Sequence, residues 1–247
     1  MRYFLELAYD GSYYHGWQVQ PNAISVQETI EKCLSVLLAS KIKITGAGRT
    51  DSGVHAKQMF AHFDSEKPLN KSLVGRVNNF LPKDIVILDC FPVNENAHAR
   101  FDAISRCYKY YISLRKNPFN YHSTWQFSNI DLDINLMNQA AQILFNYDDF
   151  TSFSKLHTDV KTNHCKISKA KWLFLEKDLL CFEITADRFL RNMVRAIVGT
   201  LTDVGRKKLS LTEFRTIIEK KDRSKAGASA PAKGLFLVEI IYPETIK

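Results

Sequence analysis

Hydrophobic and polar residues alternate in the first part of the chain in a pattern typical of strands. The alternation predicts strands at residues 2–9, 42–47, 57–63 and 85–93. A helix is expected from Ser25, because Ser25 and Glu28 match a capping box and apolar residues then recur at helical spacing. Asn70 can begin a second helix, which Pro82 would end. The predicted order is therefore β-α-β-β-α-β.

The second part of the chain repeats this order with a different sequence. The pattern predicts strands at residues 105–114, 167–175, 179–186 and 234–242, and helices at 133–146, at 187–204 and from Ser210. A wide apolar stripe runs along the helix at 187–204, and Gly205 is expected to end it. The apolar residues of 148–166 show neither helical nor strand periodicity, which predicts a loop. Long loops of this kind in a compact protein more often have a function than not.

Together the two parts predict an α+β fold. We expect two ferredoxin-like (β-α-β-β-α-β) units, at residues 1–102 and 103–247, with largely antiparallel sheets and helices on one side. Two such units usually join their sheets or face each other across a cleft, and clefts between domains are where binding sites tend to form. The predicted first unit carries a candidate catalytic loop, and the second would complete the active-site cleft.

Composition excludes several classes of protein. The 247 residues are 45% hydrophobic and 24% charged, which is typical of a globular chain, and no window is apolar enough to span a membrane. Glu6 interrupts the first apolar run, so we expect no signal peptide and a cytoplasmic location. Five cysteines without a C-x-x-C pair argue against a disulfide framework or a cysteine-rich zinc site.

The net charge of +8 lies entirely in the second part of the chain. Residues 1–102 contain 11 basic and 11 acidic residues, whereas the remainder contains 23 basic and 15 acidic residues. A basic half with interleaved aromatic residues suits a surface that binds a polyanion such as RNA. The alternative is a solvated lysine-rich surface on a protein that binds no nucleic acid.

The segment 46–56, GAGRTDSGVHA, is rich in turn-forming residues around one arginine and one aspartate. Its three glycines allow the backbone to come close to a ligand, so the segment is expected to be a loop that presents the Asp51 carboxylate. Arg49 can contact phosphate or hold Asp51 ionised. The alternative is an ordinary Asx-turn, in which Asp51 caps its own backbone.

This segment resembles the active-site signature of the tRNA pseudouridine synthase A (TruA) family, and the likeness extends along almost the whole chain. The other matching segments, in the family's order, are Tyr9-Asp10-Gly11, Gly16-Trp17-Gln18, Ser25-Val26-Gln27, Leu81-Pro82, His98-Ala99-Arg100-Phe101, Arg106-Cys107-Tyr108-Lys109-Tyr110, Asp149-Phe150-Thr151-Ser152-Phe153, Met193-Val194-Arg195 and Gly234-Leu235. The nine-residue signature is highly specific, whereas each other segment alone is weak.

The resemblance implies an isomerase that converts uridines 38, 39 and 40 in the anticodon arm of tRNA to pseudouridine. It also implies a homodimer that needs no cofactor. Breaking the N1–C1′ bond places positive charge on the ribose, as in glycoside cleavage, so an anionic oxygen is needed near that carbon. Asp51 matches the catalytic position of the motif and would supply this oxygen. It could attack the sugar or assist proton removal at C2′, and the sequence does not choose between these routes.

Four further residues can be given roles in such a reaction. The target base must turn out of an RNA stem, and Arg49 would fill the vacated space and contact phosphate. Tyr108 could stack on the flipped uracil, although a tyrosine that alternates with Tyr110 along one strand is often part of the core. Arg195 would hold Asp51 ionised. Arg191, one helical turn earlier, would contact RNA. The alternative is that both arginines only cover the edge of the apolar stripe and place their charged ends in solvent.

Basic residues near the end of the chain could follow the RNA backbone. The candidates are Arg206, Lys207 and Lys208, together with the cluster at 220–225. His157, Asp159, His164 and Cys165 could be drawn as a metal site, but their spacing matches no familiar ligand pattern, so we expect no metal.

Two other functions stay open from the residues alone. One is a non-catalytic RNA-binding protein. However, the segment 57–63 matches the RNP1 pattern of an RRM only weakly. The other is a nucleoside hydrolase. Such an enzyme would need a second carboxylate or a metal, and its small substrate would not require the excess of basic residues in the second part of the chain.

Overall fold

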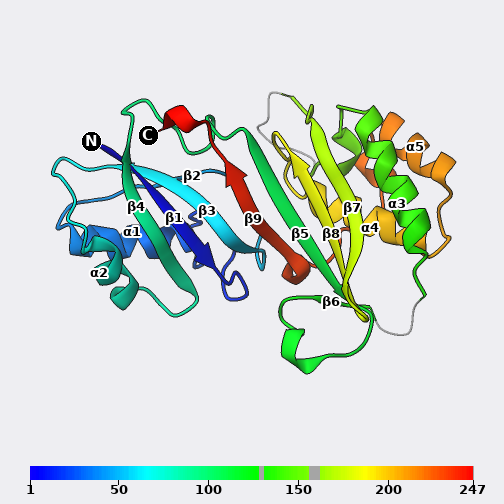
Figure 1. Cartoon of the computed structure of the whole chain (residues 1–247), viewed down its shortest axis with the longest axis horizontal. Helices are drawn as coiled ribbons and strands as arrows, with labels where there is room; N and C mark the ends of the chain where they lie inside the picture. The colour runs from blue at the N-terminus through cyan, green and yellow to red at the C-terminus, as the bar shows by residue number, and fades with distance from the viewer. Residues whose placement is uncertain (128–130, 156–161, 247) are drawn as a thin grey trace. The chain divides into compact units, whose positions relative to one another are not determined.

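The computed structural model describes residues 1–127, 131–155 and 162–246. It has a mixed α+β fold with mostly antiparallel strands and, in the described part, five α-helices (Figure 1). This confirms the predicted fold class. The chain divides into two compact units: unit 1 comprises residues 1–105 and 236–247, and unit 2 comprises residues 106–235. The sequence-based division into 1–102 and 103–247 stays a prediction.

Unit 1 is built around the strand β1. In chain order it contains β1 (Arg2–Tyr9), α1 (Val26–Leu37), β2 (Thr45–Gly46), β3 (His55–Asp64), α2 (Leu73–Phe80), β4 (Ile85–Val93) and most of β9 (Leu235–Ile241). β1 pairs antiparallel with β3 on one side and with β4 on the other. β3 also pairs antiparallel with β2 and, at its first two residues, parallel with β9. Up to β4, the order of elements agrees with the prediction.

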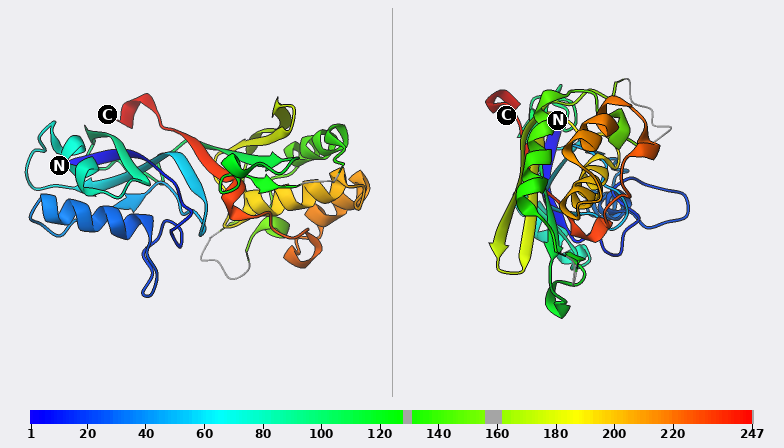
Figure 2. Two further views of the ribbon diagram at one scale, coloured as in Figure 1. Left: turned by 90° about the horizontal axis from the view of Figure 1, so that it is seen from below. Right: turned by 90° about the vertical axis from the view of Figure 1, so that its right-hand side faces the viewer.

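The helix α1 covers one face of this sheet, as the left view of Figure 2 shows. Its predicted start is confirmed, because the Ser25 side chain accepts a hydrogen bond from the Glu28 N–H. The predicted strand at 42–47 is correct only at Thr45–Gly46. Before these residues, the backbone N–H groups of Ile42 and Ile44 donate to side chains of α1, at Ser35 and Glu31, instead of to a neighbouring strand. A helix that lies alongside therefore replaces part of the expected pairing.

Unit 2 has β8 at the centre of its strands. It contains nearly all of β5 (Ser105–Ser113), then β6 (Trp125–Gln126), α3 (Ile134–Ile143), β7 (Ile167–Glu176), β8 (Leu179–Ala186), α4 (Met193–Gly205) and α5 (Leu211–Glu219). β8 pairs antiparallel with β5 and β7, and β6 pairs parallel with β5. The strands predicted at 167–175 and 179–186 are confirmed and pair as a hairpin, and the helix predicted from Ser210 begins there with a capping box of Ser210 and Glu213. The helix α4 lies against one face of these strands (Figure 2).

The prediction for the helix at 187–204 is wrong at its start. α4 begins at Met193, after Asn192, whose φ of +67° lies in the left-handed region. The Arg191 carbonyl accepts a hydrogen bond from the backbone of Lys155, so this stretch is tied to a loop rather than wound into the helix. Arg191 and Arg195 are consequently not one turn apart on a helix.

Gly205 is the last helical residue of α4, but the reason differs from the expected one. The left-handed residue after the helix is Lys207, with φ +58°. A Cβ atom on Gly205 would lie 2.5 Å from the Met137 sulfur of α3. The glycine therefore serves the close packing of two helices and not the turn that ends one.

All five cysteines are free thiols. No helix in the described part of the chain is both long enough and apolar enough to cross a membrane.

Candidate active-site residues

Asp51 lies in the loop that joins β2 to β3 in unit 1. Its carbonyl accepts a hydrogen bond from the Val54 N–H at 3.2 Å, so residues 51–54 form a tight turn. Gly53, at the third position of this turn, has φ +75°, the conformation that a type II turn requires and that glycine adopts without strain. The glycine predicted to allow tight backbone conformations therefore does so here.

The segment 10–17 packs closely against this turn. Gly16 has φ +91°, and a Cβ atom there would lie 2.5 Å from the Thr50 carbonyl oxygen. A Cβ atom on Gly11 would collide with the Val54 carbonyl. The Trp17 N–H donates to the Thr50 carbonyl at 3.1 Å, and the Gly53 N–H donates to the Tyr14 carbonyl at 3.3 Å. Two segments far apart in sequence thus hold one another by backbone contacts.

A buried hydrogen bond adds to this support. The hydroxyl groups of Tyr9, at the end of β1, and Thr50 are 2.9 Å apart, and either can be the donor. Both residues are buried. Since Thr50 directly precedes Asp51, this bond fixes the entry into the turn.

The side chains of the loop differ in their access to solvent. Arg49 is exposed and Asp51 is half-buried, while Thr50 between them is buried. The structure thus brings Arg49 and Asp51 together on one rigid loop, two residues apart. The backbone that carries this carboxylate is held in place, and the side chain is partly accessible to solvent. Both properties suit a group that acts on a bound ligand.

Asp10 and His55 form a second polar group beside the turn. His55 is buried, its ring stacks on Phe236 with centroids 4.4 Å apart, and its Nδ1 lies 3.0 Å from an Asp10 carboxylate oxygen. Burial raises the pKa of Asp10, but hydrogen bonds from Ser12 and the charge of His55 outweigh it, so this pKa lies below its ordinary value. The Gly11 nitrogen lies 3.2 Å from the same Nδ1, so the His55 ring contacts the backbone of segment 10–17 as well as the Asp10 carboxylate.

Tyr108 lies on β5 in unit 2. Tyr110 and Ile112, which share its face of the strand, are fully buried, but Tyr108 is half-buried and its ring meets Phe189 edge-on at 5.1 Å. The Tyr110 hydroxyl is used within unit 2, where it donates to the Pro231 carbonyl at 2.8 Å. Tyr110 and Ile112 are therefore core residues, whereas part of Tyr108 stays accessible.

Arg195 lies in the third position of α4 and is half-buried. Its Nε donates to the Ala230 carbonyl at 2.7 Å, and the Ala230 N–H donates back to the Arg195 carbonyl at 2.9 Å. These two bonds fix the guanidinium against the segment that precedes β9. Arg191 is exposed and lies before the helix, so the structure does not give the two arginines a common helical face.

The remaining basic candidates follow α4. Lys207 and Lys208 are exposed, while the Arg206 guanidinium lies 5.8 Å from the centroid of the Phe127 ring. The cluster at 220–225 is partly used within unit 2: Lys221 pairs with Asp149 at 2.8 Å, and Arg223 donates to the carbonyls of residues 226 and 227. Its members are thus not all equivalent surface cations.

The long loop at 148–166 can be described only in part. Two of the four residues considered above as metal ligands, His157 and Asp159, lie outside the described residues. Of the other two, His164 is exposed and lies 3.2 Å from the Asp148 carboxylate, while Cys165 is buried. The residues that the structure describes contain no group of three or more His, Cys, Asp and Glu side chains placed to hold a metal.

Sequence analysis gave no role to the residues that hold the Asp51 turn from outside. Tyr9, Tyr14, Gly16 and Trp17 all contact it through the bonds described above. The signal was present, because the segments Tyr9-Asp10-Gly11 and Gly16-Trp17-Gln18 were among the family matches. Their pairing with residues 50–54 could not be inferred, since it depends on where the loop after β1 returns.

Comparisons with known proteins match the whole chain. A family model described as tRNA pseudouridine synthase matches residues 140–243. A protein of Bacteroides fragilis named tRNA pseudouridine synthase A is 56% identical, covering 99% of this chain and 98% of the relative. Proteins with the same name from Parabacteroides distasonis and Legionella pneumophila are 53% and 39% identical, each over 99% of this chain and over 97% and 94% of their own lengths. The chain therefore belongs to the tRNA pseudouridine synthase A family.

Proposed function

We propose that this protein isomerises uridine to pseudouridine at positions 38, 39 and 40 in the anticodon stem-loop of tRNA, with Asp51 as the catalytic nucleophile. Full-length identity of more than 50% to proteins named tRNA pseudouridine synthase A supports the reaction. The observation that carries the assignment of Asp51 is its place on a turn fixed by Gly53, Gly16 and the Tyr9–Thr50 hydrogen bond.

The chemistry needs one acid and no net water. The N1–C1′ bond of uridine breaks and a C5–C1′ bond forms, while C5 loses a proton and N1 gains one. Positive charge develops on the ribose between these steps. As the proposed nucleophile, the Asp51 carboxylate bonds to C1′, and in the alternative route the same carboxylate would act as a base that takes a proton from C2′. In both routes the carboxylate must be ionised and accurately placed, which a rigid turn favours.

The target uridine has to leave its stack to reach Asp51, at a cost of a few kcal/mol. Arg49 is exposed on the same loop, so it is suited to fill the vacated space and to contact phosphate. Tyr108 has a partly accessible ring and a hydroxyl, so it is suited to stack on the uracil and to help move the C5 proton. Arg195, held by Ala230, supplies the positive charge that keeps Asp51 ionised.

This proposal includes the finer prediction for the fold. We infer that each unit is ferredoxin-like. The order β1-α1-β2-β3-α2-β4 in unit 1 supports this inference, and unit 2 shows the first five elements of the same order, β5-α3-β7-β8-α4, when the two-residue strand β6 is left aside.

The same proposal covers the RNA surface and the partners. Arg191, Lys207 and Lys208 are exposed and belong to the basic second part of the chain, so they would follow the phosphate backbone, with Arg206 beside them. We also propose a cytoplasmic location. Homodimerisation and independence of any cofactor are carried by the resemblance to the family, and sedimentation of the purified protein and activity after dialysis against a chelator test these two.

The deciding experiment replaces Asp51 while keeping the turn. Asp51→Asn and Asp51→Ala should abolish pseudouridine formation and leave tRNA affinity within a few-fold, because the carboxylate acts in the transition state more than in binding. Carbodiimide mapping of tRNA incubated with each variant measures the product. Ser52→Ala is a matched control in the same turn, since Ser52 is exposed and its hydroxyl only donates to the Tyr14 carbonyl at 3.2 Å.

The outcomes separate this proposal from the two other functions. Modification that survives in Asp51→Asn would refute the assignment of the nucleophile. A wild-type protein that binds tRNA but forms no pseudouridine would favour a non-catalytic RNA-binding protein. Release of free uracil, detected by chromatography, would instead indicate a hydrolase.

A further inference from the structure

We infer that residues 114–124 of unit 2, together with the β7–β8 turn, form an additional RNA-binding surface, in which Phe119 stacks on an unpaired base of the tRNA. Lys116 and Lys177, which line the same cavity, contact phosphates of the same RNA. This inference rests on the proposed function, because it takes tRNA to be the substrate. It adds a contact that the catalytic proposal does not use.

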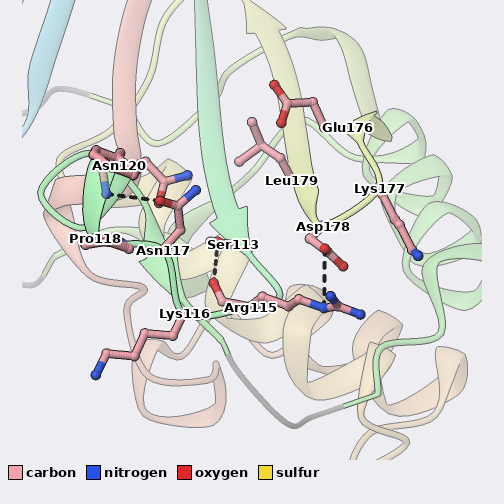
Figure 3. A pocket seen from close by; sticks show the side chains of 11 residues that line it. Ser113, Arg115, Lys116, Asn117, Pro118, Asn120, Glu176, Lys177, Asp178 and Leu179 are labelled. Carbon is pink, nitrogen blue, oxygen red and sulfur yellow. Dashed lines mark hydrogen bonds and ion pairs between the residues drawn. The ribbon is translucent and has the colours of Figure 1, made fainter.

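Two loops of unit 2 line a cavity that is open to solvent at this place. Its volume is about 530 Å³, and its lining comes from the segment after β5 and from the turn between β7 and β8 (Figure 3). The Leu114 N–H donates to the Asp178 carbonyl at 2.9 Å, and Arg115 pairs with the Asp178 carboxylate at 3.3 Å. These bonds join the two loops, so the cavity has a defined shape.

The segment after β5 is held by its own polar side chains. The Gln126 amide donates to the side chains of Asn120 and Thr124, at 3.1 and 2.6 Å, and it accepts from the Asn117 N–H at 3.0 Å. Thr124 also donates to the Asn120 carbonyl and is buried. The segment is therefore organised although it contains little regular structure.

Within this organised segment an aromatic ring is presented to solvent. Phe119 is 98% exposed, the largest value among the large apolar residues found exposed in the described part of the chain. Pro118 restricts the backbone before Phe119, and the Phe119 N–H donates to the Asn117 side chain at 3.0 Å. A rigid loop that holds an apolar ring in water gains nothing for folding, so the ring is available for a ligand.

The charges around the cavity suit a polyanion. Lys116 and Lys177 are exposed, and in Figure 3 their side chains point outward on opposite sides of the cavity. Asp178 is engaged by Arg115, which leaves Glu176 as the other acidic residue of the lining. Beyond the cavity, the Lys233 ammonium lies 3.7 Å from the centroid of the Tyr121 ring, a second pairing of cation and aromatic ring.

This chemistry favours RNA over a protein partner. Aromatic rings with neighbouring cations are how proteins bind unpaired nucleotides, since bases stack on the ring while the cations contact phosphate. The centre of a docking surface for a protein would be expected to be poor in charged residues, whereas five of the eleven residues that line this cavity are charged. The excess charge of +8 in the second part of the chain acts in the same direction.

The test measures affinity for unmodified tRNA by filter binding. Phe119→Ala should weaken Kd by roughly fivefold or more, because stacking of a base on an aromatic side chain is worth about 1–3 kcal/mol, and Phe119→Trp should restore binding. Phe80→Ala, at a 55% exposed phenylalanine of unit 1, is the matched control.

The double variant Lys116→Ala with Lys177→Ala should reduce the slope of log K against log salt by roughly 1.4, from about 0.7 for each single-stranded phosphate contact. Lys41→Ala, at another exposed lysine, should not.

The results distinguish the possible failures. Unchanged affinity in Phe119→Ala would overturn the inference, even if the wild-type protein forms pseudouridine normally. Loss of affinity together with a smaller sedimenting mass would also overturn it, because Phe119 would then contact a second protein chain. A wild-type protein that forms no pseudouridine would refute the proposed function, while the comparison of affinities would still decide whether this surface binds RNA.

Discussion

The hydrogen bond between Tyr9 and Thr50 offers a quantitative test of how the Asp51 turn is held. The two hydroxyl oxygens are 2.9 Å apart, and the residues are only 5% and 8% exposed. Tyr9→Phe removes one hydroxyl and keeps the ring beside Trp17. Loss of a partner for a buried polar group costs about 1–3 kcal/mol. The free energy for local opening of the turn should therefore fall by about that amount.

Hydrogen exchange of backbone amides measures this local opening. The informative amides are those of Trp17 and Val54, which donate to the carbonyls of Thr50 and Asp51. A loss of about 1–3 kcal/mol should make their exchange roughly 5 to 150 times faster. Tyr13→Phe is the matched control, because Tyr13 lies in the same segment but is 80% exposed.

A double-mutant cycle then tests the bond itself. Tyr9→Phe and Thr50→Val should each accelerate exchange, whereas the double variant should cost little more than either single variant, because both partners of one bond are removed. Pseudouridine formation should fall in the same variants without a matching loss of tRNA affinity. Single effects that simply add in the double variant would show that this bond does not hold the turn.

Two further predictions concern stability. Gly16→Ala should destabilise unit 1 by about 1–3 kcal/mol, because its φ is +91° and the new Cβ would lie 2.5 Å from the Thr50 carbonyl oxygen. Gly75→Ala, inside α2 with open space around it, should instead stabilise by about 0.5–1 kcal/mol, and thermal unfolding compares the two. Burial lowers the pKa of His62 to about 4 from 6.5, so its stabilising contribution should be complete above pH 6.5 and be lost as the pH falls towards 4. The free energy of unfolding of His62→Asn should depend less on pH across this range than that of the unsubstituted protein. An equal dependence in the two proteins would show that His62 is not responsible for the loss of stability.

Local patterns predicted most of the elements because each is encoded by neighbouring residues. The cap at Ser25, the capping box at Ser210 and the alternation in β5 and β8 all depend on residues a few positions apart. The segment around Asp51 was recognisable for the same reason, since its glycines and its acid lie within nine residues.

Predictions failed where distant parts of the chain decide the local structure. The strand at 42–47 was shortened because side chains of α1 bond its backbone, and α4 begins late because Lys155 bonds the Arg191 carbonyl. Gly205 was identified as a helix end, but Met137, a residue of another helix, is the reason for the glycine. These contacts have no signature in a single sequence.

The position of β9 bears on how the protein is made. This strand comes last in the chain, yet it pairs with β3 next to His55, and the Ile240 N–H donates to the side chain of Gln58 at 2.9 Å. A ribosome that has just added residue 235 has synthesised all of unit 2 but not the strand that completes unit 1. The neighbourhood of Asp51 is therefore finished late in synthesis, and tags or frameshifts at the distal end should impair the half of the protein encoded first.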